Sequence, residues 1–228
     1  MIANIPEMFL PLTLVAGLVL LAKGADWFVD GASEIAARFH LSKLVIGLTV
    51  VAVGTSAPEF AVSAYAALKG SGDIAVANVV GSNIFNLGVI LALCAMATPV
   101  MIARETVYRD CLFLVLGPLL LAIFTLADGR ISRGEGVVLA SLLVGYFVYL
   151  VRNTIKHAPA RTSSDQEQSR GRLNAKEIGV LVLGLATLLL GCKLAVDSAK
   201  IIATNMGMSE WMIGITIIAM GTSLPELV

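Results

Sequence analysis

The sequence predicts an all-α polytopic membrane protein built around a repeat whose two copies have inverted topology. Hydrophobic residues make up 57% of the 228 residues and charged residues 14%, whereas soluble domains carry about 25% charge. The mean hydropathy is +0.89. Apolar runs of roughly 20 residues, long enough to span a bilayer core, recur along the whole chain. One short polar motif occurs twice, each time at the end of an apolar approach.

The repeated motif is Gly-Thr-Ser-x-Pro-Glu, at Gly54–Glu59 and again at Gly221–Glu226, a constant offset of 167 residues. An ungapped pairing of 41–61 with 208–228 gives ten identities in 21 positions. Chance alignment of apolar segments supplies far fewer. A repeat of this kind determines the architecture, so it takes precedence over single-residue patterns.

The first three apolar runs predict helices over about 8–39, 43–68 and 74–97. The first is long, which favours a tilted span. No Lys or Arg precedes Lys23, so this run lacks the basic start of a cleaved signal peptide and we expect it to remain as a helix. The second ends at the turn 69–73, Lys-Gly-Ser-Gly-Asp, and the third ends before Pro99.

Four further helices are expected at about 107–126, 134–151, 175–205 and 210–228. The polar segment 153–174 predicts a flexible linker, because its composition cannot form an apolar core. The chain therefore divides into a first five-helix half, 1–152, that linker, and the start of a second half, 175–228. The first half holds the repeat 41–97 and the second holds its truncated copy, 208–228.

Lys and Arg in the loops predict the orientation. An outside N-terminus places ten of them in cytoplasmic loops and three in outside loops. An odd number of crossings then separates the starts of helices 43–68 and 210–228. The motif copies consequently run antiparallel and meet near the membrane midplane, as in many secondary transporters.

The motif residues have the chemistry of a cation site. A carboxylate such as Glu59 at a membrane helix centre costs on the order of 2.5–3.5 kcal/mol, which favours a functional role. Pro58 removes a backbone donor and breaks the helix near Gly54, which frees carbonyl oxygens. Carbonyls, hydroxyls and carboxylates are hard ligands suited to Ca²⁺. A single copy fits a kinked, capped helix equally well, and the second inverted copy favours the cation site.

A second polar stretch, Asn78–Asn86, lies in the third predicted helix. Ser82 and Asn86 are four residues apart and share a helix face, so both can point toward Glu59 if the second and third helices pair antiparallel. Asn78 joins this stripe, and Asn83 lies to one side. Asn and Ser in membrane helices also bond to neighbouring helices, and that structural role stays open, above all for Asn78 and Asn83.

The acidic and basic residues of the first helix receive a structural interpretation. Lys23, Asp26, Asp30 and Glu34 follow one another at spacings of three and four. Ion pairing of Lys23 with Asp26 and a solvated helix end explain them as well as a cation pathway does. Cys94, Cys111 and Cys192 lie in apolar stretches at unrelated spacings, so we expect small buried residues.

The paired Gly-Thr-Ser-x-Pro-Glu motifs, together with Gly81-Ser82-Asn83-Ile84-Phe85-Asn86, closely resemble the alpha repeats of the calcium/cation antiporter superfamily, in its bacterial sodium/calcium exchanger branch. The resemblance implies ten transmembrane helices in two inverted halves and exchange of sodium for calcium across the inner (cytoplasmic) membrane, with no further cofactor. It also implies that calcium is bound by Glu59, Glu226, Thr55, Ser56, Ser82, Asn86, Thr222, Ser223 and the carbonyls near Ala52 and Ala219.

The chain departs from that pattern after its second motif. The family has a helix matching 74–97 at this point, but the chain ends two residues after Glu226. This predicts about seven of the ten helices and leaves open a fragment that does not transport unaided.

Other functions are compatible with parts of the pattern. Two adjacent carboxylates can load protons instead of sodium, so proton coupling is the nearest alternative. An intramembrane enzyme is not expected, because no His lies in a predicted helix and the Ser residues have no base beside them except carboxylates that the repeat assigns to the cation site. The zero net charge indicates no nucleic-acid partner, leaving calcium and sodium ions and the lipid bilayer.

The linker interpretation predicts that a moderate deletion within 153–174 leaves calcium binding intact. The segment is polar and charged, so it contributes no apolar surface to the helix bundle. Calcium affinity of the purified deletion variant, measured by calorimetry, is the test. Loss of binding in a folded variant would reveal a regulatory site in the segment.

Overall fold

A computed structural model describes residues 6–38, 46–102, 104–157, 174–223 and 226, and these residues form helices and connecting turns without a strand. The helices are the 3-10 turn Glu7–Phe9, α1 (Leu10–Arg38), α3 (Ala52–Thr55), α4 (Ala57–Leu68), α5 (Gly72–Phe85), α6 (Leu91–Ala97), α7 (Arg104–Asp128), α8 (Arg133–His157), α10 (Ala175–Met206), α11 (Glu210–Ile213) and α12 (Ala219–Thr222). Three single π-helical turns interrupt the α-helices, at Gly47–Val51, Asn86–Ile90 and Gly214–Ile218.

Several helices have the length and composition of membrane spans. Among the described residues, the long apolar segments are Glu7–Ala37, Gly72–Ala97, Arg133–Asn153 and Ala175–Met206, and two shorter ones are Asp110–Leu126 and Glu210–Thr222. These segments confirm the predicted all-helical membrane class. The expected number of seven crossings stays a prediction.

The predicted linker begins too early. Helix α8 continues to His157, through residues that the sequence assigned to the linker. The apolar run ends near Val151, but no Gly or Pro follows before Pro159, so the helix extends in polar residues. At the other boundary Asn174 caps α10 in a reciprocal box with Glu177. The remainder of the predicted linker, 158–173, lies outside the described residues.

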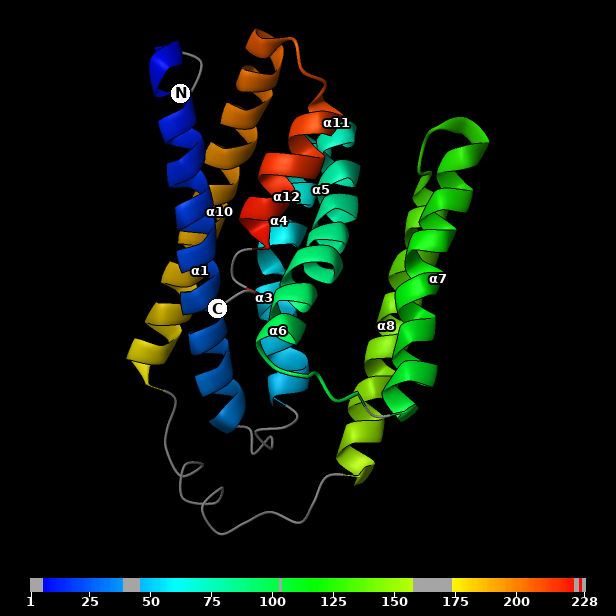
Figure 1. The fold of residues 1–228 in the computed structure, drawn as a ribbon. Helices are drawn as coiled ribbons and strands as arrows, with labels where there is room; N and C mark the ends of the chain where they lie inside the picture. The colour runs from blue at the N-terminus through cyan, green and yellow to red at the C-terminus, as the bar shows by residue number, and fades with distance from the viewer. Residues whose placement is uncertain (1–5, 39–45, 103, 158–173, 224–225, 227–228) are drawn as a thin grey trace. The chain divides into compact units, whose positions relative to one another are not determined.

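The chain forms two compact units, residues 1–93 with 160–228, and residues 94–159. In the first unit α1 and α10 lie side by side along their length (Figure 1). Glycines allow this: a Cβ on Gly17 would lie 2.6 Å from the Ala195 nitrogen, and one on Gly191 would lie 2.5 Å from the Leu21 nitrogen. Small residues let membrane helices approach to backbone contact. Helices from both predicted halves thus share one core.

Helices α7 and α8 make up most of the second unit. The Phe113 and Tyr146 rings have centroids 4.4 Å apart, and the Tyr146 hydroxyl donates to Asp110 Oδ1 at 3.0 Å. The expectation of buried cysteines is wrong for two of the three: Cys94 and Cys111 are exposed and Cys192 is buried.

A polar cluster fixes the relative direction of the two repeats. Lys200 donates to Ser71 Oγ at 2.8 Å and pairs with Glu210 Oε1 at 3.3 Å. Ser71 precedes α5 and Glu210 starts α11, so the segments 72–97 and 210–222 start at the same end of the unit. Helix α4 finishes at that end, because a short turn joins it to α5. The segments 57–68 and 210–222 are therefore antiparallel, as predicted.

The α1–α10 contact predicts that Gly191→Ala is destabilising. Its Cβ would meet backbone atoms of Leu21 and the Gly17 carbonyl oxygen, which cannot rotate away. Overpacking of this kind costs about 1–3 kcal/mol. Thermal unfolding of the purified protein in detergent should show a lower Tm.

Gly179→Ala is the matched control on the same helix. No atom lies within 4 Å of a Cβ at Gly179. Alanine should leave Tm unchanged or raise it, since it favours helix over Gly by about 0.8–1.0 kcal/mol. Equal Tm values for the two variants would contradict the close packing of α1 on α10.

Candidate cation site

The two motifs have the same backbone conformation at the same 167-residue offset. The π-turns 47–51 and 214–218 correspond, as do the four-residue helices α3 and α12. Each short helix ends at a serine outside helical geometry, Ser56 at φ −83°, ψ 2° and Ser223 at φ −89°, ψ 4°. The breaks predicted near Gly54 and Gly221 thus fall at Ser56 and Ser223. Pro58, in the first turn of α4, has no N–H to extend the helix.

The threonines hold these breaks locally. Thr55 Oγ1 donates to the Ala52 carbonyl at 3.2 Å, and Thr222 Oγ1 donates to the Ala219 carbonyl at 3.1 Å. The serine N–H groups donate to the same two carbonyls. The Ala52 and Ala219 carbonyls, both predicted ligands, therefore each accept two hydrogen bonds from within their own turn, and the two turns have matching geometry.

The structure brings Glu59 to the second motif. Ser223 Oγ donates to Glu59 Oε1 at 3.1 Å, across 164 residues of chain. Glu226 lies within electrostatic range of Glu59. One oxygen of each carboxylate, Glu59 Oε2 and Glu226 Oε2, is buried without a hydrogen-bond partner. The carboxylates of two distant motifs therefore share one polar region.

Asn78 is the central hydrogen-bonding residue of this region and is fully buried. Its Nδ2 donates to the Glu59 carbonyl at 3.2 Å and to Ser63 Oγ at 3.0 Å. Its Oδ1 accepts from Thr222 Oγ1 at 3.2 Å. The sequence did not decide whether Asn78 is a ligand or a structural residue, and it did not single out Ser63. The spacing of Ser63, four residues after Glu59, was the available signal.

The other predicted ligands and their polar neighbours differ in burial and in hydrogen bonding. Ser82 is buried, and its Oγ donates to the Asn78 carbonyl at 2.8 Å. Asn86 begins a π-turn, and its Oδ1 is buried without a hydrogen-bond partner. Asn83 is exposed and bonds only locally, to the Val79 carbonyl at 2.8 Å. Ser56 of the first motif is exposed and Thr55 is half-buried.

Close backbone packing holds α5 against the second repeat. A Cβ on Gly81 would lie 2.6 Å from both the Ala219 Cβ and the Ile215 carbonyl oxygen. A Cβ on Gly214 would lie 2.8 Å from the Ala77 Cβ. Glycine at these positions lets the two segments come close enough for Asn78 to reach the second motif.

The charged residues of α1 take no part in this network. Lys23 pairs with Asp26 at 3.2 Å, which confirms that part of the structural interpretation. Asp30 and Glu34 are exposed. Asp197, the repeat counterpart of Asp30, accepts the Tyr65 hydroxyl at 3.2 and 3.4 Å and so joins α10 to α4.

The buried oxygens without partners fall mainly on the predicted ligands. Among the described residues, the buried side-chain polar atoms without a hydrogen-bond partner are Ser33 Oγ, Glu59 Oε2, Asn86 Oδ1, Ser198 Oγ and Glu226 Oε2. Such atoms are costly to bury, so each calls for an explanation. Oxygens from carboxylate and amide groups are the ligand type that suits a hard cation. In the described part of the chain, no group of three or more His, Cys, Asp or Glu gathers as a metal site.

Asn78→Ala should destabilise the protein. It removes two donors and one acceptor from a fully buried position, and an unpaired buried group costs about 1–3 kcal/mol. Thermal unfolding in detergent is the measurement. Asn83→Ala is the matched control, being the same change on the same helix at an exposed position, and should leave Tm nearly unchanged. A larger drop for Asn83→Ala would contradict the central role of Asn78.

Comparison with known proteins identifies close relatives. The chain is 44% identical over 220 residues to the protein CaxA of Alkalimonas amylolytica, covering 94% of this chain and 68% of that protein. It is 32% identical over 255 residues to the sodium/calcium exchanger MaX1 of Methanosarcina acetivorans, covering 95% of this chain and 72% of that protein.

Solved structures agree with these relatives. A structure of the sodium-calcium exchanger NCX_Mj superposes with a TM-score of 0.59 at 35% identity, over 97% of this chain and 71% of that one. A structure of the sodium/calcium exchanger from Methanococcus jannaschii superposes with a TM-score of 0.55 at 34% identity, over 97% and 70%. The family model described as sodium/calcium exchanger protein matches residues 9–152 and 176–228. The chain therefore belongs to the sodium/calcium exchanger protein family.

Proposed function

We propose that this chain carries the ion-binding site of an antiporter that exchanges sodium for calcium across the inner (cytoplasmic) membrane, with its N-terminus outside. The observation that carries the proposal is the meeting of the two motifs. Ser223 of the second motif bonds to Glu59 of the first, and one oxygen of each motif carboxylate is buried without a partner. The names of the relatives supply the two ions.

The ligands are oxygen atoms from both repeats. Glu59 and Glu226 provide two negative charges, which balance one Ca²⁺. Neutral oxygens come from Asn86, Ser82, Ser223, Thr222, Thr55 and Ser56, and from the Ala52 and Ala219 carbonyls. Calcium takes six to eight oxygens at about 2.3–2.6 Å, so a set drawn from several segments suits it. By the repeat offset, Ser56 is the donor that corresponds to Ser223 and serves Glu226.

Shared ligands account for exchange. Sodium and calcium use the same hard oxygens, so loading of one ion excludes the other. Because the two broken segments are antiparallel, their polar ends converge on one place from opposite sides of the membrane. Each ion then stabilises the conformations that it binds more tightly, and the gradient of one ion drives the other.

Calcium-45 flux in inverted membrane vesicles tests the coupling. We expect an imposed sodium gradient to drive calcium movement at constant pH. Movement driven by a pH gradient in the absence of sodium would instead establish proton coupling. Flux with neither gradient, in vesicles whose protein binds calcium, would contradict antiport.

Glu59→Gln and Glu226→Gln should each weaken calcium binding strongly. Gln keeps the size and hydrogen bonding of Glu but leaves one negative charge facing a doubly charged ion. Loss of one buried charge partner costs roughly 2–5 kcal/mol. Calorimetry on the purified variants measures the calcium affinity.

Asp30→Asn is the matched control. It makes the same chemical change at an exposed position on α1, away from the hydrogen bonds of the motifs. We expect calcium affinity close to that of the parent protein. Near-parent affinity for Glu59→Gln, or a collapse for well-folded Asp30→Asn, would overturn the assignment of ligands.

A further inference from the structure

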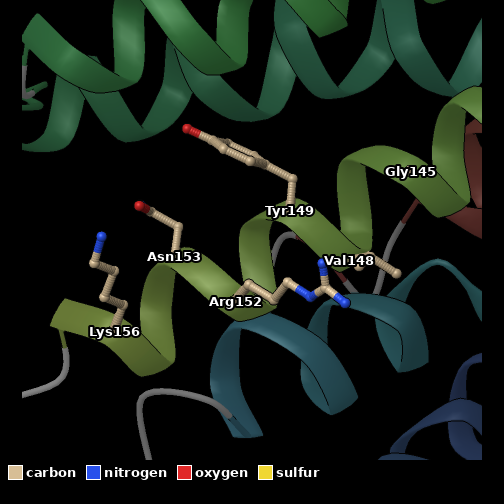
Figure 2. A pocket seen from close by; sticks show the side chains of 6 residues that line it. All are labelled: Gly145, Val148, Tyr149, Arg152, Asn153 and Lys156. Atoms are coloured by element: carbon tan, nitrogen blue, oxygen red, sulfur yellow. The ribbon is translucent and has the colours of Figure 1, made fainter.

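A cavity of about 390 Å³ lies along the C-terminal half of α8, remote in sequence from both motifs. It is lined by Gly145, Val148, Tyr149, Arg152, Asn153 and Lys156. Successive positions are separated by alternating intervals of three residues and one residue, which places them along one broad face of a helix. Figure 2 shows the side chains of Tyr149, Asn153 and Lys156 extending to the same side of α8.

The cavity lies where α8 passes from an apolar to a polar environment. The apolar span covers Arg133–Asn153, and the helix continues in polar residues to His157. Gly145 and Val148 therefore line its apolar end, and Lys156 lines its polar end. Tyrosine is enriched at this depth of a membrane, and Arg and Lys extend their charged groups toward the headgroups.

The charge of the cavity is positive. Arg152 and Lys156 are exposed, and none of its lining residues is acidic. Asp110 of the paired helix accepts the Tyr146 hydroxyl at 3.0 Å. Arg104 starts α7 at the same end of the α7–α8 pair, because the turn at 129–132 reverses the chain. The lining of the cavity, with Arg152 and Lys156, thus favours an anion.

We propose that this cavity binds the phosphate headgroup of an anionic glycerophospholipid. Arg152 and Lys156 donate to the phosphate oxygens, and Tyr149 lies beside the glycerol backbone. The acyl chains extend along the apolar part of α8, past Val148 and Gly145. A free phosphate ion would use only the polar end of the cavity, whereas a lipid matches the change from apolar to basic lining. Basic pockets beside transmembrane helices bind anionic headgroups by this combination of charge and apolar contact.

The site is separate from ion exchange, and its test needs no transport. The purified chain in detergent is titrated with dioleoylphosphatidylglycerol or dioleoylphosphatidylcholine, and native mass spectrometry measures both dissociation constants. We expect tighter binding of phosphatidylglycerol. The double variant Arg152→Gln/Lys156→Gln should lose this preference by roughly fivefold per charge removed.

Two further variants make the result specific. Arg152→Lys/Lys156→Arg keeps both charges and should retain the preference. Arg130→Gln/Arg133→Gln removes two charges at the opposite end of the α7–α8 pair and should also retain it. An unchanged preference in the Arg152/Lys156 double variant, or an equal loss in the Arg130/Arg133 variant, would overturn the proposal. Displacement of the lipid by millimolar inorganic phosphate would show an anion site without lipid specificity and would equally overturn it.

Discussion

The hydrogen bond from Ser223 to Glu59 is the contact on which the rest of the structure depends. A carboxylate within an apolar segment must find donors or a counter-charge, because lipid provides neither. Glu59 obtains its side-chain donor from a residue 164 positions away. The other oxygen of Glu59 stays unpartnered and buried. The fold thus holds in place a carboxyl group with one bonded and one unpartnered oxygen, as the proposed cation site requires.

The repeated backbone geometry makes this contact possible. A π-turn, a four-residue helix and a break at serine occur in each copy with nearly identical torsion angles at Ser56 and Ser223. π-turns inside helices are often found at functional sites because they redirect side chains and release backbone carbonyls. In each copy, the Thr residue just before the break donates its hydroxyl to the carbonyl three residues earlier. Because the two equivalent segments are antiparallel, they form complementary sides of the polar region that they share.

Glycine and asparagine residues make further contacts between the helices possible. Gly81 lets α5 touch the second repeat at backbone distance, and this proximity lets Asn78 bond to Glu59, Ser63 and Thr222 together. A larger residue at position 81 would separate these partners. Between α1 and α10 the same principle applies without polar groups, since Gly17 and Gly191 allow contact by packing alone. Hydrogen bonds between helices thus depend on close approach of the helices and form where polar residues are present.

The sequence by itself determined the helical class, the repeat offset and the break beside Pro58, and it singled out the two motif carboxylates as candidate ligands, because these follow from composition, periodicity and local backbone chemistry. It placed the start of the linker too early, since the polar end of α8 carries no apolar signal. It could not decide between the two roles of Asn78, nor foresee that Ser63 and Tyr65 would acquire partners. Those roles depend on which helix faces meet, and only the tertiary structure brings Thr222 and Asp197 to them. A hydrogen bond between residues more than 100 positions apart is set by packing, which local sequence does not encode.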